Sequence, residues 1–555
     1  MKVEVVKVLS NALEEKLSSF QIEKMLEKPK YEHLGDIAFP CFALAKQLRK
    51  SPAQIAQDLV QKISINTFEK VEVHGGYINF FYKKEKIAYE VISKVLKERE
   101  LYGTKKVTGS RVLVDFSSPN IAKPFSMGHL RSTVIGQALA NLAEKNGDEA
   151  VRINHLGDWG TQFGKLIVAY KLWGDQKRVQ DSPIEELLKL YVKFHDEEDN
   201  DLSEQARAAF KALEDGDEEA QKLWQWFKEE SLKEFASLYE LLNIGFDSYA
   251  GEAFYNDKMQ KVIVELQEKG LLVESDGADV VELENMPPCL IKKNDGATLY
   301  ATRDLAAGFY RMQTYKPKAI YYVVGNEQSL HFKQWFKVVE KMGHSWADNL
   351  HHIPFGMMLK DGKKMSTRKG KVVLLEDVLA ETISMAKENI EQKNPLLENK
   401  EEVAKAVGIG AVLFNDLKNF RLNDLEFSLE EMLNFEGETG PYVQYTYARI
   451  QSLLSKRALN VDKKFNLVIG EYEWSILTQL QAFTEIIESS YKQADPSLIA
   501  KYALKLARAF NKYYGNSKIL TDDEFLSGRL ALCDSVAIVL KESLRLLGIE
   551  APKKM

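Results

Sequence analysis

Residues 112–147 read VLVDFSSPNIAKPFSMGHLRSTVIGQALANLAEKNG, an apolar run followed by a polar loop and a long amphipathic stretch. The β-branched start predicts a strand that ends at Phe116, and the apolar spacing from Leu130 onward predicts a helix. In an open α/β sheet, ligands bind beyond the carboxyl ends of the strands, and anions favour the N-terminal end of the following helix. The loop between these two elements is therefore where we expect a phosphate chain to bind.

This loop offers several groups suited to phosphate, although it is not a P-loop, because no G-x-x-x-x-G-K-[ST] pattern occurs in it. Gly128 lets a nucleotide approach the backbone, His129 can donate a hydrogen bond to a phosphate or ribose oxygen, and Lys123 supplies a compact positive charge. Ser126 adds a hydroxyl group. A histidine at a helix start is by default structural, so it is the combination that indicates nucleotide binding.

The composition limits the possible classes of protein. The chain has 555 residues, of which 45% are hydrophobic and 28% charged, as in an ordinary globular protein of about three or four domains. The N-terminal MKVEVVKVLSNALEEKL lacks the unbroken apolar run of a secretory signal, and no later run approaches the roughly 20 apolar residues that span a bilayer. We therefore expect a cytoplasmic protein without a membrane partner.

The cysteines and histidines do not form an obvious metal site. Cys41, Cys289 and Cys533 are scattered without a C-x-x-C pair, which argues against a disulfide framework and against a thiolate zinc site. His351 and His352 are adjacent, so on a strand they would point to opposite faces and make poor joint ligands. We expect no zinc and no other metal held by the protein alone.

The overall charge does not indicate a nucleic-acid partner, because the formal net charge is -6 at pH 7. The densest basic patch is LKDGKKMSTRKGK, residues 359–371, in which six lysines and arginines surround two glycines. Taken alone, such a run is most simply a solvated loop.

Three parts follow one another along the chain and predict a multidomain α/β protein. Residues 1–106 mix helical spacing with the strand-like GGYINFFY, which predicts a small α+β domain. In residues 107–410, short β-branched runs alternate with amphipathic helices, which predicts a parallel sheet with crossover helices, interrupted by a helical insertion at about 175–250. Residues 411–555 contain no convincing strand, and their helical apolar spacing predicts an all-helical bundle.

Two short motifs on this background resemble signatures of one enzyme class. SMGH, at residues 126–129, is similar to the HIGH signature of class I aminoacyl-tRNA synthetases, and KMSTR, at residues 364–368, is similar to their KMSKS loop. Their order and separation also fit that class, in which HIGH lies in the first half of a Rossmann-type domain and KMSKS follows its last half.

The flanking sequence resembles one family in particular, the arginyl-tRNA synthetases. Segments similar to that family occur in its order: FSSPNIAKPFSMGHLRST, NHLGDWGTQFG, DGATLYATRDLAA, YYVVGNEQSLHFKQ and ETGPYVQYTYAR. The likeness runs from GDIAFP near the N-terminus to the closing LLGIEAPKKM. It implies that residues 1–106 are an additional tRNA-binding domain, residues 107–410 a Rossmann-type catalytic domain, and residues 411–555 a helical anticodon-binding domain.

The resemblance also implies a reaction. Arginine would be activated by ATP with Mg²⁺ to arginyl-adenylate and pyrophosphate, and the arginyl group would then move to the 3'-terminal ribose of arginine tRNA. The partners would be L-arginine, ATP and this tRNA, and we expect a monomer. The residues that match ATP-binding positions are Lys123, Ser126, Gly128, His129, Lys364, Met365 and Ser366, and those in catalytic roles are Lys123, His129 and Lys364.

Arginine needs a site that accepts hydrogen bonds from a planar guanidinium, which carboxylates do best. Tyr300 and Asp304 are four residues apart, which on a helix puts both on one face. An equally open alternative is that Asp304 pairs with a neighbouring arginine, Arg303 or Arg311, while Tyr300 merely packs. By resemblance, the arginine-binding residues are Asp115, Asn120, Tyr300, Asp304 and Gln328.

The motifs depart from the usual pattern at two positions. Ser126 replaces the first histidine of HIGH, and Thr367 replaces the second lysine of KMSKS. A serine hydroxyl still bonds phosphate, but a threonine cannot replace the charge of a lysine. By resemblance, Lys123 compensates, with help from Lys364 and Lys369. The alternative is that Lys123 is a solvated loop residue, in which case activation should survive its loss.

The tRNA-binding residues are also inferred from the resemblance. Asn79 and Tyr82 match a region that reads a base of the tRNA elbow, with a buried strand as the equal alternative. In the helical part, tyrosines and one arginine could stack on anticodon bases, although a tyrosine stripe at helical spacing is more often core. These residues are Tyr442, Tyr445, Tyr447 and Arg449, and Met555 is the last candidate.

Other functions remain to be weighed against the synthetase. A HIGH-type nucleotidyltransferase that does not charge tRNA would leave the first and last domains without a role. A catalytically inactive tRNA-binding relative is allowed by Ser126 and Thr367, but it is disfavoured because Lys123, His129 and Lys364 remain. A cysteinyl relative is disfavoured by the missing zinc-type cysteines.

Overall fold

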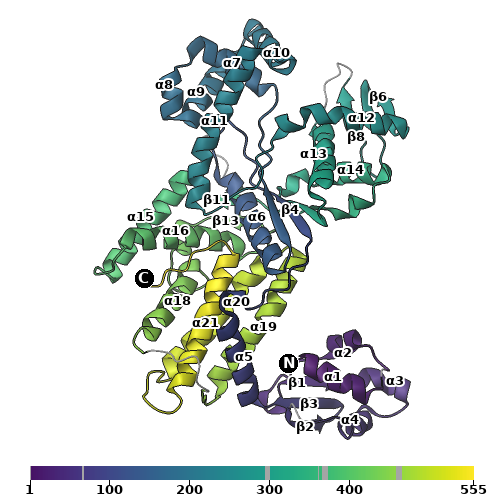
Figure 1. Cartoon of the computed structure of the whole chain (residues 1–555), viewed down its shortest axis with the longest axis vertical. Coiled ribbons are helices and arrows are strands. Elements are labelled where there is room, and N and C mark those ends of the chain that lie inside the picture. The colour runs from purple at the N-terminus through teal and green to yellow at the C-terminus, as the bar shows by residue number, and fades with distance from the viewer. Residues whose placement is uncertain are drawn as a thin grey trace. The chain divides into compact units, whose positions relative to one another are not determined.

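The computed structural model describes residues 2–14, 16–65, 68–293, 300–360, 362–364, 373–457 and 465–555, and Figure 1 traces them. The chain divides into two compact units. The first comprises Met1–Lys97, Leu459–Thr478 and Lys518–Leu532, and the second comprises Glu98–Ala458, Gln479–Ser517 and Cys533–Met555. Helices α19 (Glu471–Gln493) and α21 (Leu526–Leu546) each contribute residues to both.

The first unit is built around an antiparallel sheet of three strands in the order β1-β3-β2. These are β1 (Ile37–Pro40), β2 (Phe68–His74) and β3 (Tyr77–Tyr82), so the strand predicted in GGYINFFY is confirmed as β3. Gly75 opens the β2–β3 turn with a φ of 60°, which glycine adopts without steric cost. The helices of this unit are α1 (Lys2–Ala12), α2 (Ser19–Met25), α3 (Ala45–Leu48), α4 (Pro52–Val60) and α5 (Lys84–Glu98) up to Lys97.

Asp36, just before β1, ties this sheet to the start of α19. Its carboxylate accepts hydrogen bonds from the backbone N–H of Tyr82 at 2.9 Å and from Nε1 of Trp474 at 3.1 Å. Tyr89 of α5 also lies against Phe465, with ring centres 5.4 Å apart. The first unit therefore joins segments that are distant in the sequence.

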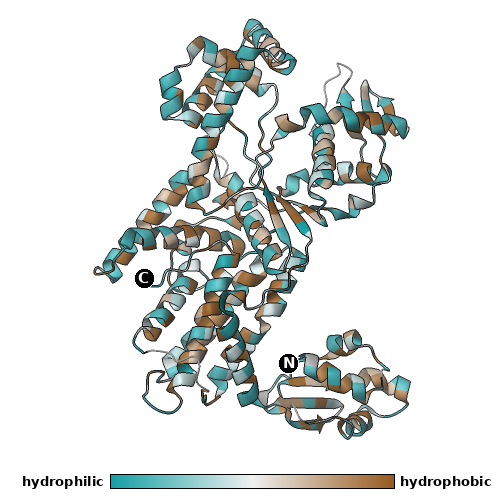
Figure 2. Ribbon diagram, in the orientation of Figure 1, coloured by the Kyte–Doolittle hydropathy of each residue, from teal (hydrophilic) through white to brown (hydrophobic). Residues whose placement is uncertain are grey.

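The second unit contains the predicted parallel sheet, in the order β10-β9-β4-β5. Its strands are β4 (Arg111–Asp115), β5 (Glu149–Ile153), β9 (Ala319–Tyr322) and β10 (Leu350–His352). Much of their length is brown in Figure 2, as expected for a parallel sheet whose faces are covered. Helix α6 (Met127–Lys145) connects β4 to β5, and α14 (Ser329–Lys341) connects β9 to β10. The strand–helix alternation expected from the sequence is confirmed.

Two inserted segments separate β5 from β9. The first is a helical group with its own apolar core: α7 (Gln162–Trp173), α8 (Gln176–Asp181), α9 (Pro183–Asp196), α10 (Asn200–Asp215) and α11 (Glu218–Leu241). The second contains α12 (Met259–Glu268), α13 (Tyr300–Tyr315) and an antiparallel sheet of β6 (Leu272–Ser275), β7 (Ala278–Val281) and β8 (Cys289–Lys293). The sequence did not predict this sheet, because its strands are short and β6 has no buried residue.

A third small sheet follows β10, in the order β12-β11-β13. It consists of β11 (Met358–Lys360), β12 (Lys363–Lys364) and β13 (Leu425–Glu426). The expectation of no strand beyond residue 411 is therefore wrong at β13, because two residues are too few to show an alternating pattern. The single strand expected in HIPFGMML is also divided, between the end of β10 and the start of β11.

Helices make up most of the remaining chain: α15 (Leu375–Lys393), α16 (Lys400–Leu417), α17 (Leu429–Met432), α18 (Gly440–Leu454), α20 (Ser497–Asn516) and the second-unit parts of α19 and α21. Helix α16 packs against α15, α18 and α6, and it passes through residue 410, where the sequence suggests a domain boundary. A Cβ on Gly410 would lie 2.7 Å from Nε2 of Gln444, so this glycine permits the close approach of α16 and α18.

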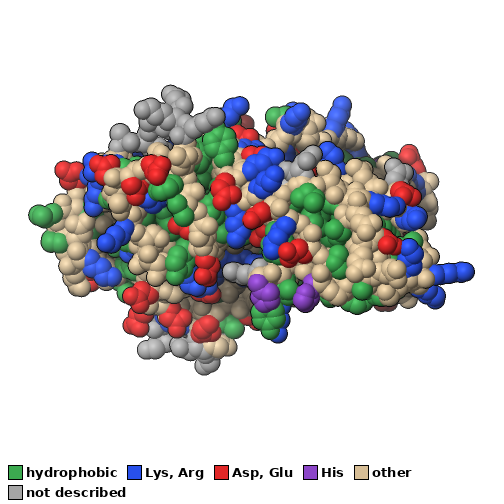
Figure 3. Space-filling model, turned by 90° about the horizontal axis from the view of Figure 1, so that it is seen from below, with side chains coloured by type: hydrophobic (Ala, Val, Ile, Leu, Met, Phe, Trp, Pro, Cys, Tyr) green, Lys and Arg blue, Asp and Glu red, His purple; other side chains and the backbone are tan. Residues whose placement is uncertain are grey.

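On the face drawn in Figure 3, lysines and arginines are interspersed with aspartates and glutamates, so this face has no extended patch of one sign. Within the described ranges, no helix is long and apolar enough to traverse a bilayer.

Candidate active site

The loop that follows β4 has an unusual backbone. Ser117, Ser118 and Ala122 all have positive φ, of 71°, 47° and 59°, a conformation that costs free energy for residues other than glycine and concentrates at functional sites. Helix α11 supports the loop at both ends. The hydroxyl of Tyr239 lies 2.8 Å from the Ser117 hydroxyl, and the backbone N–H of Ala122 donates to Oγ of Ser231 at 3.0 Å. The helical insertion therefore holds the predicted phosphate-binding loop in shape.

Helix α6 begins at Met127, three residues earlier than the sequence suggested, and His129 lies in its first turn. Ser126 is the N-cap residue, and its backbone N–H donates to Nδ1 of His129 at 3.1 Å. Burial lowers the pKa of His129 below its ordinary value, so the ring is neutral near pH 7. Because Nδ1 accepts a hydrogen bond, the ring proton lies on Nε2, which is then a donor. The histidine is thus both structural, as an N-terminal cap, and available to an anion.

Lys123 is partly exposed, and its ammonium lies 5.8 Å from the ring centre of Tyr191 in α9. Within the described part of the chain it has no carboxylate within ion-pair distance, so its charge remains available for phosphate. The role of Lys123 in ATP binding stays a prediction, because a partly exposed ammonium near an aromatic ring is compatible with both alternatives.

Backbone hydrogen bonds join the SMGH motif to residues 373–375, which follow the KMSTR motif in the sequence. Ser126 bridges to Leu374, the N–H of Met127 donates to the carbonyl of Val373 at 3.0 Å, and the N–H of Leu375 donates to the carbonyl of Phe125 at 3.0 Å. Met365, Ser366, Thr367 and Lys369 lie outside the described residues, as does the side chain of Lys364, whose backbone ends β12. The described residues 373–375, which follow this loop in the sequence, lie beside the start of α6.

Arg131, two residues after His129, connects α6 to the segments that flank β11 and β13. Its Nη1 donates to the carbonyls of Gly356 and Asn423 at 2.8 Å each, and its Nε donates to Oδ2 of Asp416 in α16 at 3.0 Å. Both side chains of this ion pair are only 1% exposed. The helix that carries His129 is therefore coupled to the strands that lead into the KMSTR loop.

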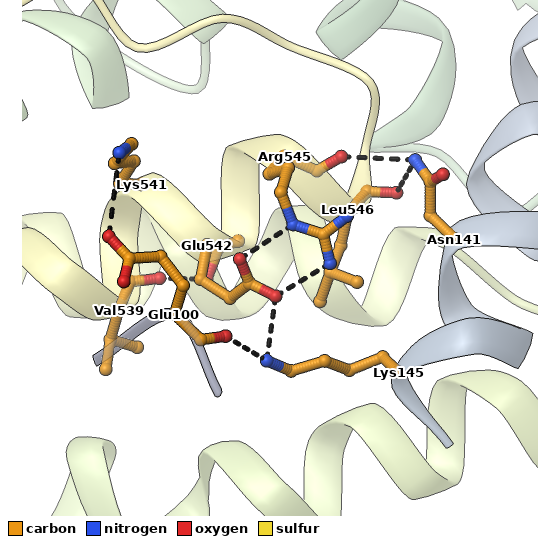
Figure 4. Close-up of polar contacts among 9 residues, drawn as sticks. Glu100, Asn141, Lys145, Val539, Lys541, Glu542, Arg545 and Leu546 are labelled. Carbon is orange, nitrogen blue, oxygen red and sulfur yellow. Dashed lines mark hydrogen bonds and ion pairs between the residues drawn. The ribbon is translucent and has the colours of Figure 1, made fainter. Parts of the chain in front are cut away.

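The other end of α6 is held by a second buried ion pair, drawn in Figure 4. Nζ of Lys145 lies 2.8 Å from Glu542 in α21 and donates to the carbonyl of Glu100 at 2.7 Å. Glu542 also accepts two hydrogen bonds from Arg545, at 2.8 Å each. The amide of Asn141 donates to the carbonyl of Arg545 at 3.1 Å. Helix α6 is thus anchored to the helical part of the second unit along its length.

Asp304 is open to the site and has a partner that the sequence did not suggest. Its Oδ2 lies 2.6 Å from Nε2 of His331 in α14, and its side chain is 29% exposed. The alternative pairing with Arg303 or Arg311 is wrong, because Arg303 lies against Glu252 at 3.5 Å and Arg311 against Asp115.

Tyr300 begins α13, one turn before Asp304, and is 70% exposed. The alternative that this tyrosine merely packs is therefore wrong. Tyr300 and Asp304 both remain accessible to a ligand, on the same helix.

Asp115, at the end of β4, is 5% exposed and already binds a guanidinium within the chain. Its Oδ2 lies 2.7 Å from Nη1 of Arg311, and its Oδ1 accepts a hydrogen bond from the Ser118 hydroxyl at 3.1 Å. A direct contact between Asp115 and arginine stays a prediction, and such a contact would have to share the carboxylate with Arg311.

Asn120 and Gln328 are both exposed, at the carboxyl ends of β4 and β9 respectively. The segment that carries Asn120 is paired to Gly157, whose N–H donates to the carbonyl of Pro119 at 3.0 Å. A Cβ on Gly157 would lie 2.0 Å from Oδ1 of Asn120, so only glycine fits beside this side chain.

Comparisons with known proteins agree with this geometry. Residues 91–429 match the family tRNA synthetases class I (R), catalytic domain, residues 443–555 match the DALR anticodon binding domain, and residues 4–82 match the Arginyl tRNA synthetase N terminal domain. The arginine–tRNA ligase of Exiguobacterium sibiricum is 55% identical over 100% of both chains, and arginine–tRNA ligase 2 of Bacillus anthracis is 54% identical over 100% of both. The chain belongs to the arginyl-tRNA synthetase family.

Solved structures support the same assignment. The arginyl-tRNA synthetase of Thermus thermophilus has a TM-score of 0.82 at 25% identity, and that of Plasmodium falciparum has a TM-score of 0.81 at 26% identity. The first comparison covers 100% of both chains. The family, the fold class and the ligase activity expected from the motifs are therefore confirmed.

Glu252 is a carboxylate near Asp304 that the sequence reasoning missed. Its side chain is 17% exposed and lies 3.5 Å from Nη1 of Arg303. Burial raises its pKa to about 7, and the charges of Asp304 and Asp158 act in the same direction. No local motif marks this glutamate, because the three carboxylates come from separate segments that only the fold brings together.

The candidate anticodon residues of the synthetase divide into exposed and buried ones. Arg449 lies between two exposed rings, 4.8 Å from the ring centre of Tyr445 and 5.1 Å from that of Tyr514, and its Nη1 donates to Asn511 at 2.6 Å. Tyr514 and Asn511 were not predicted, because they come from α20. Tyr447 is only 3% exposed, so its assignment to tRNA binding is corrected to a core position.

Tyr442 and Met555 both accept hydrogen bonds from asparagine side chains of the same chain. Asn511 donates to the hydroxyl of Tyr442 at 3.0 Å, and the carbonyl of Met555 accepts from Asn394 at 3.2 Å. Tyr442 is partly exposed, and Asn511 links it to Arg449 by hydrogen bonds to both side chains. Met555 is held at Asn394, the residue that follows α15.

The two candidates in the first unit are buried. Asn79 is 4% exposed and Tyr82 is 1% exposed, both in β3. Their burial favours the alternative of a buried strand over direct contact with a tRNA base, because such a contact would require accessible surface at these side chains.

A substitution at Gly157 should test the placement of Asn120. In Gly157→Ala, the added Cβ would displace the Asn120 amide, so we expect the arginine KM to rise by at least about tenfold, the cost of one hydrogen bond to a charged group. The KM for ATP should change little. Gly160→Ala is the control, because no atom lies within 4 Å of a Cβ there, although its φ of 135° adds some strain. Equal effects of both substitutions would contradict the prediction.

Proposed function

We propose that the loop after β4, the first turn of α6 and the KMSTR loop bind ATP, and that the neighbouring carboxylates bind the arginine side chain. The backbone pairing of Phe125–Met127 with Val373–Leu375 is the observation that carries this proposal, because it brings the segment after the KMSTR motif to the start of α6, beyond the carboxyl end of β4. Ligands of open α/β sheets bind beyond the carboxyl ends of the strands.

For the first step, arginine carboxylate attacks the α-phosphate of ATP, giving arginyl-adenylate and pyrophosphate. Negative charge on the phosphate oxygens is then stabilised by Nε2–H of His129 and by the ammonium of Lys123, so positioned donors matter more than a general base. Lys364, Met365 and Ser366 would add to this group from the KMSTR loop, and Ser126 and Gly128 would line it.

Mg²⁺ is expected to bind mainly to the ATP phosphates and to water. Among the described residues, no group of three or more histidines, cysteines or carboxylates could hold a metal ion. The carboxylates at the sheet edge are engaged by Arg311, Arg303 and His331, which suits the recognition of a cation by hydrogen bonds better than metal ligation.

For the arginine itself, Asp304 and Glu252 would accept hydrogen bonds from the guanidinium and Tyr300 would lie along it. Asn120 and Gln328, which are exposed at neighbouring strand ends, would orient the α-amino and carboxylate groups, since an amide offers both donors and acceptors. Asp115 would act by holding Arg311 or by sharing its carboxylate.

In the second step, the 3'-terminal ribose hydroxyl of the tRNA attacks the arginyl carbonyl and releases AMP. We propose that the exposed group of Tyr445, Arg449 and Tyr514 stacks on an unpaired anticodon base, because an arginine between two aromatic rings offers both stacking and a cation. The enzyme would act as a monomer in the cytoplasm, where its tRNA is found.

The test is ATP–pyrophosphate exchange with purified protein across the amino acids, with and without tRNA. We expect exchange with arginine only, and only when tRNA is present, as the resemblance implies. Exchange with arginine in the absence of tRNA would support the specificity for arginine but would show that activation does not require tRNA. No exchange in either condition would contradict the assigned ATP site and favour an inactive relative.

Glu252 predicts how arginine binding depends on pH. With its pKa raised to about 7, Glu252 is largely protonated below that pH, and a bound guanidinium favours the ionised form. Arginine binding should therefore release a proton and weaken as the pH falls below about 7, by up to about tenfold per pH unit.

Calorimetry at pH 6 and pH 8, in buffers of different ionisation enthalpy, measures this proton release directly. Glu252→Gln should bind arginine more weakly at pH 8 and lose most of the difference between the two pH values. An equal arginine affinity of the unaltered protein at both values would rule out the role of Glu252.

A further inference from the structure

The hydrogen bond between Asp304 and His331 joins two partly exposed polar groups at the proposed arginine site. It joins Oδ2 of Asp304, in α13, to Nε2 of His331, in α14, over 2.6 Å. The two side chains are 29% and 27% exposed, so the pair borders the open site. His331 belongs to neither signature motif and was not among the predicted site residues.

The fold fixes His331 firmly. It lies one turn beyond Gln328, and the hydroxyl of Ser329 caps this turn by donating to the carbonyl of Asn326 at 2.7 Å. The next residue, Phe332, is 6% exposed and stacks on His352 with ring centres 4.4 Å apart. The imidazole therefore projects from a helix start that cannot shift without disturbing the core.

A fixed histidine restricts the orientation of the carboxylate that it contacts. A carboxylate can only accept, so Nε2 of His331 carries the proton and donates to Oδ2. This bond holds the plane of Asp304, and among the described residues no hydrogen bond engages Oδ1. A guanidinium donates through a rigid planar fork and needs a carboxylate in one orientation, whereas the ammonium of lysine is a point charge that accepts many.

We propose that His331 is a positioning residue that fixes the plane of Asp304, and that it thereby favours a guanidinium over an ammonium side chain. This inference rests on the proposed role of Asp304 in binding arginine. It assigns His331 no contact with the reacting atoms, so the residue acts through Asp304 alone.

The chain supplies a matched control for this pair. His344 and Glu265 form a second histidine–carboxylate pair in the same unit, with Nε2 and Oε1 2.7 Å apart and side chains 26% and 28% exposed. Removing the histidine from either pair should cost a similar amount of stability, because distance and exposure are nearly equal. Only one of the two borders the proposed arginine site.

The experiment compares His331→Leu, His331→Gln and His344→Leu in the full-length protein with saturating tRNA. The arginine KM, the ATP KM, kcat and the lysine-dependent exchange rate are measured for each, with melting temperatures as a check on folding. For His331→Leu we expect an arginine KM about tenfold to a hundredfold higher, an unchanged ATP KM and a smaller preference for arginine over lysine. His331→Gln, whose amide can still donate to Asp304, should recover most of the loss.

Two results would overturn the proposal: an arginine KM in His331→Leu no higher than in His344→Leu, or equal losses in the leucine and glutamine variants. Asp304→Asn separates this failure from a failure of the site. If Asp304→Asn leaves the arginine KM unchanged, the proposed arginine site is wrong; if only this variant raises it, the site stands and the role of His331 is rejected.

Discussion

Replacing Asp304 by asparagine should raise the KM for arginine far more than the KM for ATP. The substitution keeps the size of the side chain but removes the negative charge that, in the proposed site, binds the substrate guanidinium. Truncating one partner of a hydrogen-bonded charge pair costs about 2–5 kcal/mol, which corresponds to about 30-fold or more in affinity. Steady-state charging of tRNA, with arginine and ATP varied separately, measures both constants.

Glu265→Gln is the control for this substitution, since it neutralises a carboxylate of similar exposure that also contacts a histidine. We expect Glu265→Gln to have the same KM for arginine and the same KM for ATP as the unaltered protein. A proportional loss for both substrates in Asp304→Asn would refute the assignment, because it would indicate damage to the whole site.

The loop after β4 could be predicted because its signals are local. A buried strand, a polar loop and a helix with regular apolar spacing follow one another without a break, and the ligand edge of a parallel sheet is set by strand direction alone. The start of α6 was misplaced at Leu130 because Ser126 and His129 cap the helix together, and histidine is not a usual residue at that capping position.

The partners of the buried charges could not be predicted, since they depend on which distant segments the fold brings together. From its spacing along one helix, Asp304 seemed as able to pair with a neighbouring arginine, Arg303 or Arg311, as to bind the substrate guanidinium. In the structure these arginines instead contact Glu252 and Asp115, which come from other segments. His331 and Glu252 were missed for the same reason, because neither has a sequence pattern of its own.

The burial of single aromatic residues was also beyond the sequence. Tyr445 and Tyr447 are the same residue type in similar local sequence on α18. They are two positions apart, so they point to different sides of the helix. Only the folded structure shows that Tyr445 is 38% exposed while Tyr447 is 3% exposed. A tyrosine stripe therefore predicts the domain better than its binding residues.

Lys145→Met should destabilise the second unit, because it leaves part of the charge of Glu542 buried without its partner. The two side chains are 2% and 3% exposed, and removing one member of a buried pair costs about 3–5 kcal/mol. Arg545 still contacts Glu542, as Figure 4 shows, so we expect a loss near the lower end, about 3 kcal/mol. Urea denaturation of the full-length protein, followed by tryptophan fluorescence and circular dichroism, measures the change.

Two further variants separate this loss from the removal of any lysine. Lys541→Met removes an exposed pair with Glu100, 3.8 Å long, and should change stability by less than about 1 kcal/mol. The double variant Lys145→Met/Glu542→Leu replaces the buried pair by apolar side chains, and it leaves Arg545 half exposed to water. Because an apolar replacement of a buried pair is often neutral, the double variant should recover most of the stability lost in Lys145→Met. If Lys145→Met and the double variant were equally unstable, the stabilising contact would be the hydrogen bond from Lys145 to Glu100 and not the ion pair with Glu542.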